Sequence, residues 1–325
     1  MIFGFWYFKF AGHHVRLDAS RVPDDFWGIT FSKKYAEELG LDWRETYLAL
    51  LDEMKIRNIR IPVYWDDIER MKDSFSFDEY DWMLAEGSKR NAHFILAVGR
   101  RLPRWPECHQ PDWTKSFSTD ALTSEQLAMV SATIQHFAQV PSIRYWQLEN
   151  EFFFRWFGLC PKPDVELLKK EIALLKAYDQ RPLILTDSGE LNSWRQAAQY
   201  SDMLGITIYR VVWNNYFGYF RWPWPGLLYR AKALWVGKSP ENAIVAELQA
   251  EPWPANFKKN DQISRDEYLK SFSVKQMETN SEIARRTGFR QAYFWGAEWW
   301  YWLKLHGDAT IWQAAREIIS TAHEE

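Results

Sequence analysis

The feature that most constrains the fold of this 325-residue chain is a regular alternation of short apolar segments with longer segments of helical periodicity. Short apolar runs bounded by turn-forming residues are typical of buried strands. Eight such runs occur along the chain, at 26–31, 58–65, 93–99, 143–148, 182–186, 203–209, 243–247 and 291–295. Strands that alternate with helices pair in parallel through right-handed crossovers, and eight such units close into a barrel. The sequence therefore predicts an α/β fold, a single (β/α)8 TIM barrel.

The segments between these strands predict helices, because apolar residues recur on one face at helical spacing. One helix begins after Asp42, which forms a capping-box pattern with Glu45. The others are expected from Ser124 onward and at 78–91, 164–177, 194–200, 227–235, 264–288 and 309–322. The long loops follow the strands, and two of them, 100–122 and 152–163, are rich in aromatic residues. Such loops would lie on the C-terminal face of the barrel, where barrel enzymes have their active sites.

Residues 1–25 precede the predicted barrel domain, which spans residues 26–325 without a break in composition. The segment from Met1 to Gly12 is aromatic and apolar, but it is too short to span a bilayer. It also lacks the basic start and the small-residue cleavage site of a signal peptide. It is either the remnant of a membrane anchor or a strand that covers the bottom of the barrel. Association with a membrane is expected only through an anchor at this end.

The charge and the aromatic content of the chain limit the kinds of partner that it binds. A net charge of -3 and the lack of a Lys/Arg run give no basis for binding nucleic acid. The 20 tryptophans are unusual, and many of them lie beside Pro, Gly or charged residues in predicted loops. Most large aromatic residues fill a core, whereas aromatic residues in loops are typical of a binding surface. Flat rings suit the C–H faces of sugars, so a carbohydrate is the predicted partner.

The chain has two cysteines, Cys108 and Cys160, and neither belongs to a CxxC pair. The seven histidines show no ligand spacing with acids or cysteines, so the sequence predicts no metal site and no other cofactor. In a barrel the two cysteines would lie in loops that follow adjacent strands, the third and the fourth. We expect a disulfide between them, with two unpaired thiols as the alternative.

Two glutamates at predicted strand ends have the chemistry that glycoside hydrolysis requires. Glu151 follows the fourth strand and Glu247 ends the seventh, and these strands face each other across the barrel. Hydrolysis with retention needs one carboxyl group to protonate the leaving oxygen while another attacks the anomeric carbon. We expect Glu151 to be the acid, with its pKa raised by the charge of Glu247. Glu149 would share the face of Glu151 on an extended strand, but a turn after Asn150 would separate the two.

Asn150-Glu151 at the end of the fourth strand, with Glu247 at the end of the seventh, resembles the pattern of the clan A glycoside hydrolases. That clan includes family 5 cellulases and mannanases and family 42 β-galactosidases. The resemblance implies that Asn150 binds the 2-hydroxyl of the sugar, that Glu151 is the acid/base and that Glu247 is the nucleophile. Gln249 stands where family 5 usually has glycine and is nearer to family 42, so the individual family stays open.

Other strand ends agree with this resemblance. It implies that Arg60 supports the nucleophile, that Tyr209 donates a hydrogen bond to it, and that Trp295 is the platform under the sugar. Weaker candidates for sugar subsites are Trp65, Arg101, Trp105 and His109. Glu251 is predicted to be a substrate or structural ligand, and Glu298 either binds sugar hydroxyls or belongs to a loop salt bridge. Asp187 and Glu190 are predicted to line the cleft or to cap a helix.

The sequence thus predicts a retaining glycoside hydrolase that cleaves a β-linked oligo- or polysaccharide by double displacement. The alternative is a catalytically inactive carbohydrate-binding TIM barrel, which would keep the aromatic loops. A disulfide and a glycan substrate favour a secreted or cell-surface protein, whereas the lack of a clear signal peptide favours a cytoplasmic one. The sequence does not specify the sugar, its linkage, endo or exo action, or the oligomeric state.

Overall fold

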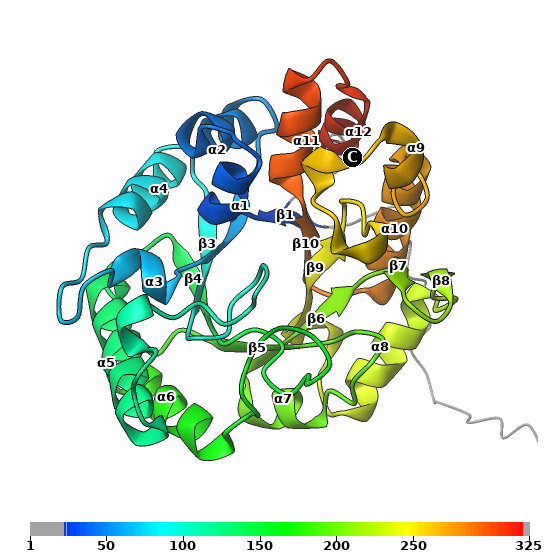
Figure 1. Cartoon of the computed structure of the whole chain (residues 1–325). Coiled ribbons are helices and arrows are strands. Elements are labelled where there is room, and N and C mark those ends of the chain that lie inside the picture. The colour runs from blue at the N-terminus through cyan, green and yellow to red at the C-terminus, as the bar shows by residue number, and fades with distance from the viewer. Residues whose placement is uncertain (1–22, 24, 321–325) are drawn as a thin grey trace, which may run out of the picture.

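Eight parallel strands form a closed barrel in the computed structural model, which describes residues 23 and 25–320 (Figure 1). The strands are β1 (Trp27–Thr30), β2 (Asn58–Pro62), β3 (His93–Val98), β4 (Ile143–Leu148), β5 (Leu183–Asp187), β6 (Met203–Ile208), β9 (Ala243–Gln249) and β10 (Gln291–Trp295). They pair in this order around the barrel, and β10 closes it by pairing with β1. The predicted (β/α)8 barrel is therefore confirmed.

Helices surround this barrel, as Figure 1 shows in a view down its axis. Those that the sequence predicts are α2 (Trp43–Asp52), α4 (Asp78–Ser88), α5 (Thr119–Phe137), α6 (Val165–Tyr178), α7 (Arg195–Tyr200), α8 (Gly226–Trp235), α10 (Val274–Thr287) and α12 (Thr310–Ser320). Their ends follow the local chemistry of the chain. The Asp42 side chain caps α2 by accepting from the backbone N–H groups of Arg44 and Glu45, and Gly288 ends α10 with a φ of 66°.

Several predicted boundaries are wrong, and two of the differences follow from helix caps. The helix expected at 264–288 is broken into α9 (Arg265–Tyr268) and α10, since Ser264 and Ser273 each cap a separate helix. Helix α5 begins at Thr119 rather than after Ser124, because the Ser118 side chain accepts from the backbone N–H of Ala121. The second strand ends at Pro62 instead of residue 65.

Several short elements lie in segments that the sequence assigned to loops or strand ends. They are the helices α1 (Lys33–Glu38), α3 (Trp65–Ile68) and α11 (Ala297–Leu305), the hairpin of β7 (Val211–Asn214) and β8 (Gly218–Arg221), and the 3-10 turns η1 (Asp112–Thr114), η2 (Pro240–Asn242), η3 (Ala255–Phe257) and η4 (Asn260–Gln262). All of them except η2 follow a barrel strand directly or lie in the long loop after one. They therefore build the face on which the strands end.

A disulfide links the loop after β3 to the loop after β4. The bond joins Cys108 to Cys160, with an S–S distance of 2.05 Å and a sequence separation of 52. The prediction of a disulfide is confirmed, and the alternative of two free thiols is excluded. Closing a loop of this length stabilises a folded chain by roughly 4 kcal/mol in the chain-entropy description.

The bottom of the barrel is covered in part by the chain that leads into β1. The backbone carbonyl of Asp25 accepts from the side-chain amides of Asn58 and Gln291, at the starts of β2 and β10. The role predicted for residues 1–25, and with it the domain division at residue 26, stays a prediction because 1–22 and 24 lie outside the described residues. None of the helices in the described part of the chain has the length and apolarity needed to cross a membrane.

Candidate active site

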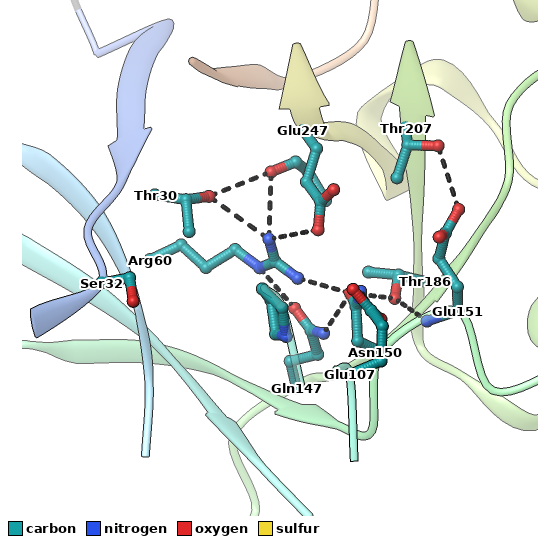
Figure 2. Close-up of polar contacts among 12 residues, drawn as sticks. Thr30, Ser32, Arg60, Glu107, Gln147, Asn150, Glu151, Thr186, Thr207 and Glu247 are labelled. Carbon is teal, nitrogen blue, oxygen red and sulfur yellow. Dashed lines mark hydrogen bonds and ion pairs between the residues drawn. The ribbon is translucent and has the colours of Figure 1, made fainter. Parts of the chain in front are cut away.

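A single arginine at the centre of the barrel joins three strands near their C-terminal ends. Arg60 of β2 is fully buried, and its Nη1 donates to Oε1 of Glu247 at 2.9 Å (Figure 2). Its Nη2 donates to Oδ1 of Asn150 at 2.7 Å, and its Nε donates to Oε1 of Gln147 at 2.7 Å. A buried cation is stable only when it is paired and hydrogen-bonded. The Arg60 network meets this requirement and fixes the positions of the groups around it.

Glu247 is held at both of its carboxylate oxygens. Oε1 accepts a hydrogen bond from the Arg60 guanidinium, and Oε2 accepts one from the Tyr209 hydroxyl at 2.8 Å. The side chain is only 3% exposed, because it lies near the C-terminal end of β9 inside the barrel mouth. Two donors, one on each oxygen, leave this carboxylate little freedom to rotate. A carboxylate held in this way is oriented to attack the anomeric carbon of a sugar bound beside it.

Glu151 lies in a different electrostatic environment. Its backbone N–H donates to the Thr186 hydroxyl at 2.8 Å, and Oε1 accepts from the Thr207 hydroxyl at 3.1 Å. Burial raises the pKa of Glu151 well above its ordinary value, and the charges of Glu247 and Glu107 raise this pKa further. The expected rise in the pKa of Glu151 is therefore confirmed. A carboxyl group that keeps its proton near neutral pH can donate it.

The side chains of Glu151 and Glu247 lie in the same polar centre. Thr207, which donates to Glu151, is the register partner of Glu247 between β6 and β9. Figure 2 shows both side chains at this centre, with Arg60 and Asn150 beside them. The structure thus brings together two carboxyl groups from strands on opposite sides of the barrel. One is bound by a cation, and the other has a raised pKa.

The turn that follows β4 separates Glu149 from Glu151. Glu149 and Glu151 have positive φ angles of 57° and 42°, so the chain is no longer extended here. The Glu149 carboxylate is directed away from the centre and accepts from the backbone N–H groups of Arg100 and Arg101 at 2.9 and 2.7 Å. The preference for Glu151 over Glu149 in the site agrees with this geometry.

Asn150 and Tyr209 both contact the Arg60–Glu247 pair. Asn150 accepts from Arg60 and from Thr186, whose hydroxyl is 3.1 Å from Oδ1, so its amide nitrogen faces the other way. Tyr209 is half-buried and bonded to Glu247. Trp295 ends β10, and its ring meets Tyr209 at a centroid distance of 6.5 Å and the Arg104 guanidinium at 4.0 Å. The binding roles of these residues stay predictions.

Two predicted substrate ligands do not face the centre. Trp65 is fully buried, and its indole N–H donates to Glu69, because this residue begins α3 instead of ending a strand. Glu298 is fully buried in α11, where it accepts from the Ser32 backbone N–H and pairs with Arg104 at 3.4 Å. Neither side chain offers a surface to a sugar. Of the two interpretations of Glu298, the structural salt bridge is correct.

The weaker subsite predictions concern residues of the loop after β3. Trp105 lies on the surface, 60% exposed, with its ring against Phe157 at 5.9 Å. Arg104, which the sequence analysis did not single out, reaches across the barrel mouth and pairs with Glu251 at 2.5 Å. Glu251 is therefore a structural ligand in this structure, and Trp105 stays a predicted contact for substrate outside the centre.

Glu107 is a carboxyl group of the centre that the sequence reasoning missed. It is 4% exposed, and its Oε2 accepts from the Asn150 amide at 3.3 Å. Burial, with the nearby charge of Glu247, raises the pKa of Glu107 to about 8. The available signal was an acid next to Cys108 in a long loop, since long loops without regular structure are often functional. Among the described residues there is no group of three or more His, Cys, Asp or Glu that could hold a metal ion.

A second pair of buried carboxyl groups, Glu149 and Glu171, lies at the turn after β4. Glu171 of α6 is fully buried and shares the Gln126 amide with Glu149, at 2.6 and 2.9 Å. Burial and the charge of Glu149 raise the pKa of Glu171 well above its ordinary value. A proton on Glu171 lets this pair exist without two adjacent negative charges.

We expect Glu171→Gln to make stability less dependent on pH. The pKa of Glu171 is raised in the folded protein, so the folded protein binds the Glu171 proton more tightly than the unfolded chain does. The stability that this proton contributes is lost as the pH rises above the ordinary pKa of 4.5. Glutamine has no proton to lose, so the melting temperature of the variant should increase relative to that of the wild type as the pH rises above about 5. Thermal unfolding at several pH values measures this. Glu166→Gln, on an exposed position of the same helix, is the control. A difference that does not change with pH would contradict the paired state.

Comparison with known proteins gives matches of structure only, since no family model and no curated protein matches the sequence. The chain is similar to the GH5_18 protein of Streptomyces cattleya in complex with GlcNAc, with a TM-score of 0.57, 12% identity, and coverage of 85% of this chain and 70% of that one. It is similar to a β-galactosidase of Bacillus circulans sp. alkalophilus, with a TM-score of 0.59, 12% identity, and coverage of 91% and 55%.

A third similar structure is xylanase 10B of Thermotoga petrophila RKU-1 in complex with xylobiose. The TM-score is 0.56 at 13% identity, and the match covers 92% of this chain and 95% of the xylanase. The chain thus spans about half of the β-galactosidase but nearly all of the xylanase. At such low identity these likenesses establish the fold. The resemblance to clan A glycoside hydrolases holds at this level, over most of the chain.

Proposed function

We propose that this protein is a retaining glycoside hydrolase that cleaves β-glycosidic bonds, with Glu247 as the nucleophile and Glu151 as the acid/base. One observation carries the proposal. Two carboxyl groups share a buried centre in different surroundings: Glu247 is bonded to Arg60, whereas Glu151 accepts from a threonine hydroxyl and has a raised pKa. This division of roles is what a double displacement at an anomeric carbon needs.

In the first step Glu247 forms a bond to the anomeric carbon while the bond to the leaving oxygen breaks. Glu151 gives its proton to that oxygen, so the leaving group departs as a neutral alcohol. Arg60 and Tyr209 hold the Glu247 oxygens during the attack. The product of this step is a glycosyl ester of Glu247, with inverted configuration at the anomeric carbon.

In the second step water replaces the enzyme on the anomeric carbon. Glu151, now ionised, removes a proton from the water, and the bond between the sugar and Glu247 breaks. Configuration is inverted a second time, so the product keeps the configuration of the substrate. In this proposal the Asn150 amide, which accepts a hydrogen bond from Arg60, binds the 2-hydroxyl of the same sugar.

The proposed substrate is a β-linked oligo- or polysaccharide. Two of the similar structures are a β-galactosidase and a xylanase with xylobiose, whose names describe action on β-linked sugars. The exposed ring of Trp105 supports contact with sugar units beyond the cleavage point. The disulfide between two site loops and the proposed glycan substrate together support a secreted or cell-surface location.

The test is a screen of aryl β-glycosides and β-linked polysaccharides with the wild-type protein, in which the anomer formed first is identified by NMR. Turnover that releases the β-anomer first is the expected result. Release of the α-anomer would contradict double displacement. Binding of an oligosaccharide without turnover of any substrate would instead support the carbohydrate-binding alternative.

A further inference from the structure

The loop after β3 carries Glu107 into the catalytic centre in a fixed position. The residue has a φ of 72°, its backbone N–H donates to the carbonyl of Arg104 at 2.7 Å, and its own carbonyl accepts from Leu102 at 2.7 Å. The next residue, Cys108, is bonded to Cys160 in the loop after β4. Glu107 is thus held by a tight turn on one side and a covalent bond on the other.

The loop after β4 also packs closely against Glu107. Gly158 has a φ of 86°, and a Cβ atom at this position would lie 2.7 Å from the Cβ of Glu107. Only glycine fits so close to the Glu107 side chain with this backbone conformation. Both loops therefore position a side chain that none of the steps proposed above uses.

The Glu107 carboxyl group is one of three groups that fix which way the Asn150 amide faces. Arg60 and Thr186 donate to Oδ1 of Asn150, and Oε2 of Glu107 accepts from its Nδ2. These contacts use the amide oxygen and one of the two N–H groups. The other N–H remains for a substrate hydroxyl. Without an acceptor on the nitrogen side, one of the contacts that define this orientation is lost.

The charges that face Glu107 come from several elements. Glu247 of β9 and Glu151 beyond β4 are negative when ionised, whereas Arg60 of β2 and Arg101 of the β3 loop are positive. Arg101 lies 3.8 Å from Oε2 of Glu107, but its Nη1 and Nη2 atoms donate to the carbonyl oxygens of Phe154 and Phe157. Asp187 adds a further negative charge beside Glu151. The balance raises the pKa of Glu107 to about 8, chiefly because the group is buried.

We propose that Glu107 is a positioning residue of this centre, which orients the Asn150 amide for a substrate hydroxyl from its position beside Glu151 and Glu247. The inference rests on the proposed hydrolase function and adds a third carboxyl group to it. Ionisation of Glu107 raises the pKa of Glu151, so the charge of this residue controls the pH range in which the acid keeps its proton.

Two substitutions of Glu107 separate its effect on the orientation of the Asn150 amide from the effect of its charge. Glu107→Gln keeps an acceptor for Asn150 but never ionises, so its main effect should be on the pH dependence of activity. Above about pH 8 the missing charge lets Glu151 lose its proton earlier, so the alkaline limb of kcat/KM should move to lower pH by roughly one unit. Glu107→Ala removes the acceptor and should lower kcat/KM for an aryl β-glycoside roughly tenfold. The loss should be smaller for the matching 2-deoxy glycoside and for Glu107→Ala in an Asn150→Ala background.

Glu69→Gln is the matched control. Glu69 is also buried, and burial also raises its pKa, but it is bonded to Trp65 and Asp73 outside the centre. This variant should leave the pH profile of kcat/KM unchanged. An unchanged alkaline limb in Glu107→Gln, or a full loss from Glu107→Ala when Asn150 is already alanine, would overturn the inference.

A stability measurement tests the proton on Glu107 without any substrate. The raised pKa means that stability is lost as pH increases from about 4.5 to about 8, and Glu107→Gln should be spared this loss. The melting temperature of Glu107→Gln should therefore increase relative to that of the wild type over this pH range. If the wild type hydrolyses no glycoside while this gain is observed, the hydrolase assignment fails and the protonated Glu107 is supported. If the gain is absent, the inference fails whatever the activity.

Discussion

Glu247→Ala is expected to lower turnover of an aryl β-glycoside by more than roughly ten-thousand-fold, because no other group can form the bond to the anomeric carbon. The substitution also leaves a space beside Arg60, which formerly bound the carboxylate. Azide should enter this space and attack the anomeric carbon, and the product should be a glycosyl azide of inverted configuration. Steady-state kinetics with and without azide, followed by NMR of the product, measure both effects.

Glu151→Ala should behave differently at the same centre. Aryl glycosides with good leaving groups need little protonation, so their first step should survive and the second should become slow. Azide should then release a glycosyl azide of retained configuration, because it attacks the ester on Glu247 in place of water. Glu69→Gln, a buried site outside the centre, should retain activity and serves as the control. Near-normal turnover in both alanine variants would refute the assignment.

Arg60→Met is expected to cause the largest loss of stability, about 3–5 kcal/mol, because it leaves the buried Glu247 carboxylate without its cation. It also removes the donors to Asn150 and Gln147. Equilibrium unfolding in urea, compared at a common slope, gives the difference in free energy of unfolding. Adding Glu247→Gln to Arg60→Met should recover part of the loss, since no unpaired charge then remains.

The control for Arg60 is an arginine whose ion pair is exposed to solvent. Arg286 pairs with Glu282 one turn away on α10, and its side chain is 61% exposed. Arg286→Met should cost less than about 1 kcal/mol, as exposed pairs usually do. Similar losses for the two arginines, or no recovery in the double variant, would show that the Arg60 network does not depend on its charge.

The barrel strands were predictable because each is a short apolar run in a helix-rich background. The predicted and observed bounds of the fourth strand coincide at Ile143–Leu148. A residue at the end of such a strand has its location fixed by the fold, whatever its neighbours. Hence Glu151 and Glu247 were found by their positions at predicted strand ends, the resemblance to clan A glycoside hydrolases added Arg60, Asn150 and Tyr209, and the structure brings these residues to one centre.

The misassigned residues lie where the chain folds locally after leaving a strand. Trp65 and Glu298 each fall in a short helix that follows a barrel strand, and such helices carry too few residues for a periodic signal. Glu107 was missed for a related reason. Its position depends on a turn at Arg104 and on a disulfide between two loops, and both are tertiary features. No spacing in the sequence shows that its carboxyl group reaches Asn150.

The Arg60–Glu247 contact has a consequence for how the molecule is assembled. The two residues are 187 positions apart, and β1 and β10, the pair that closes the barrel, lie between the strands that carry them. Contacts between such distant segments form late and slowly during folding. Recovery of enzymatic activity after dilution from denaturant should therefore lag behind recovery of helical circular dichroism. A fragment that stops before β9 would contain Arg60 without its partner and could fold no working centre.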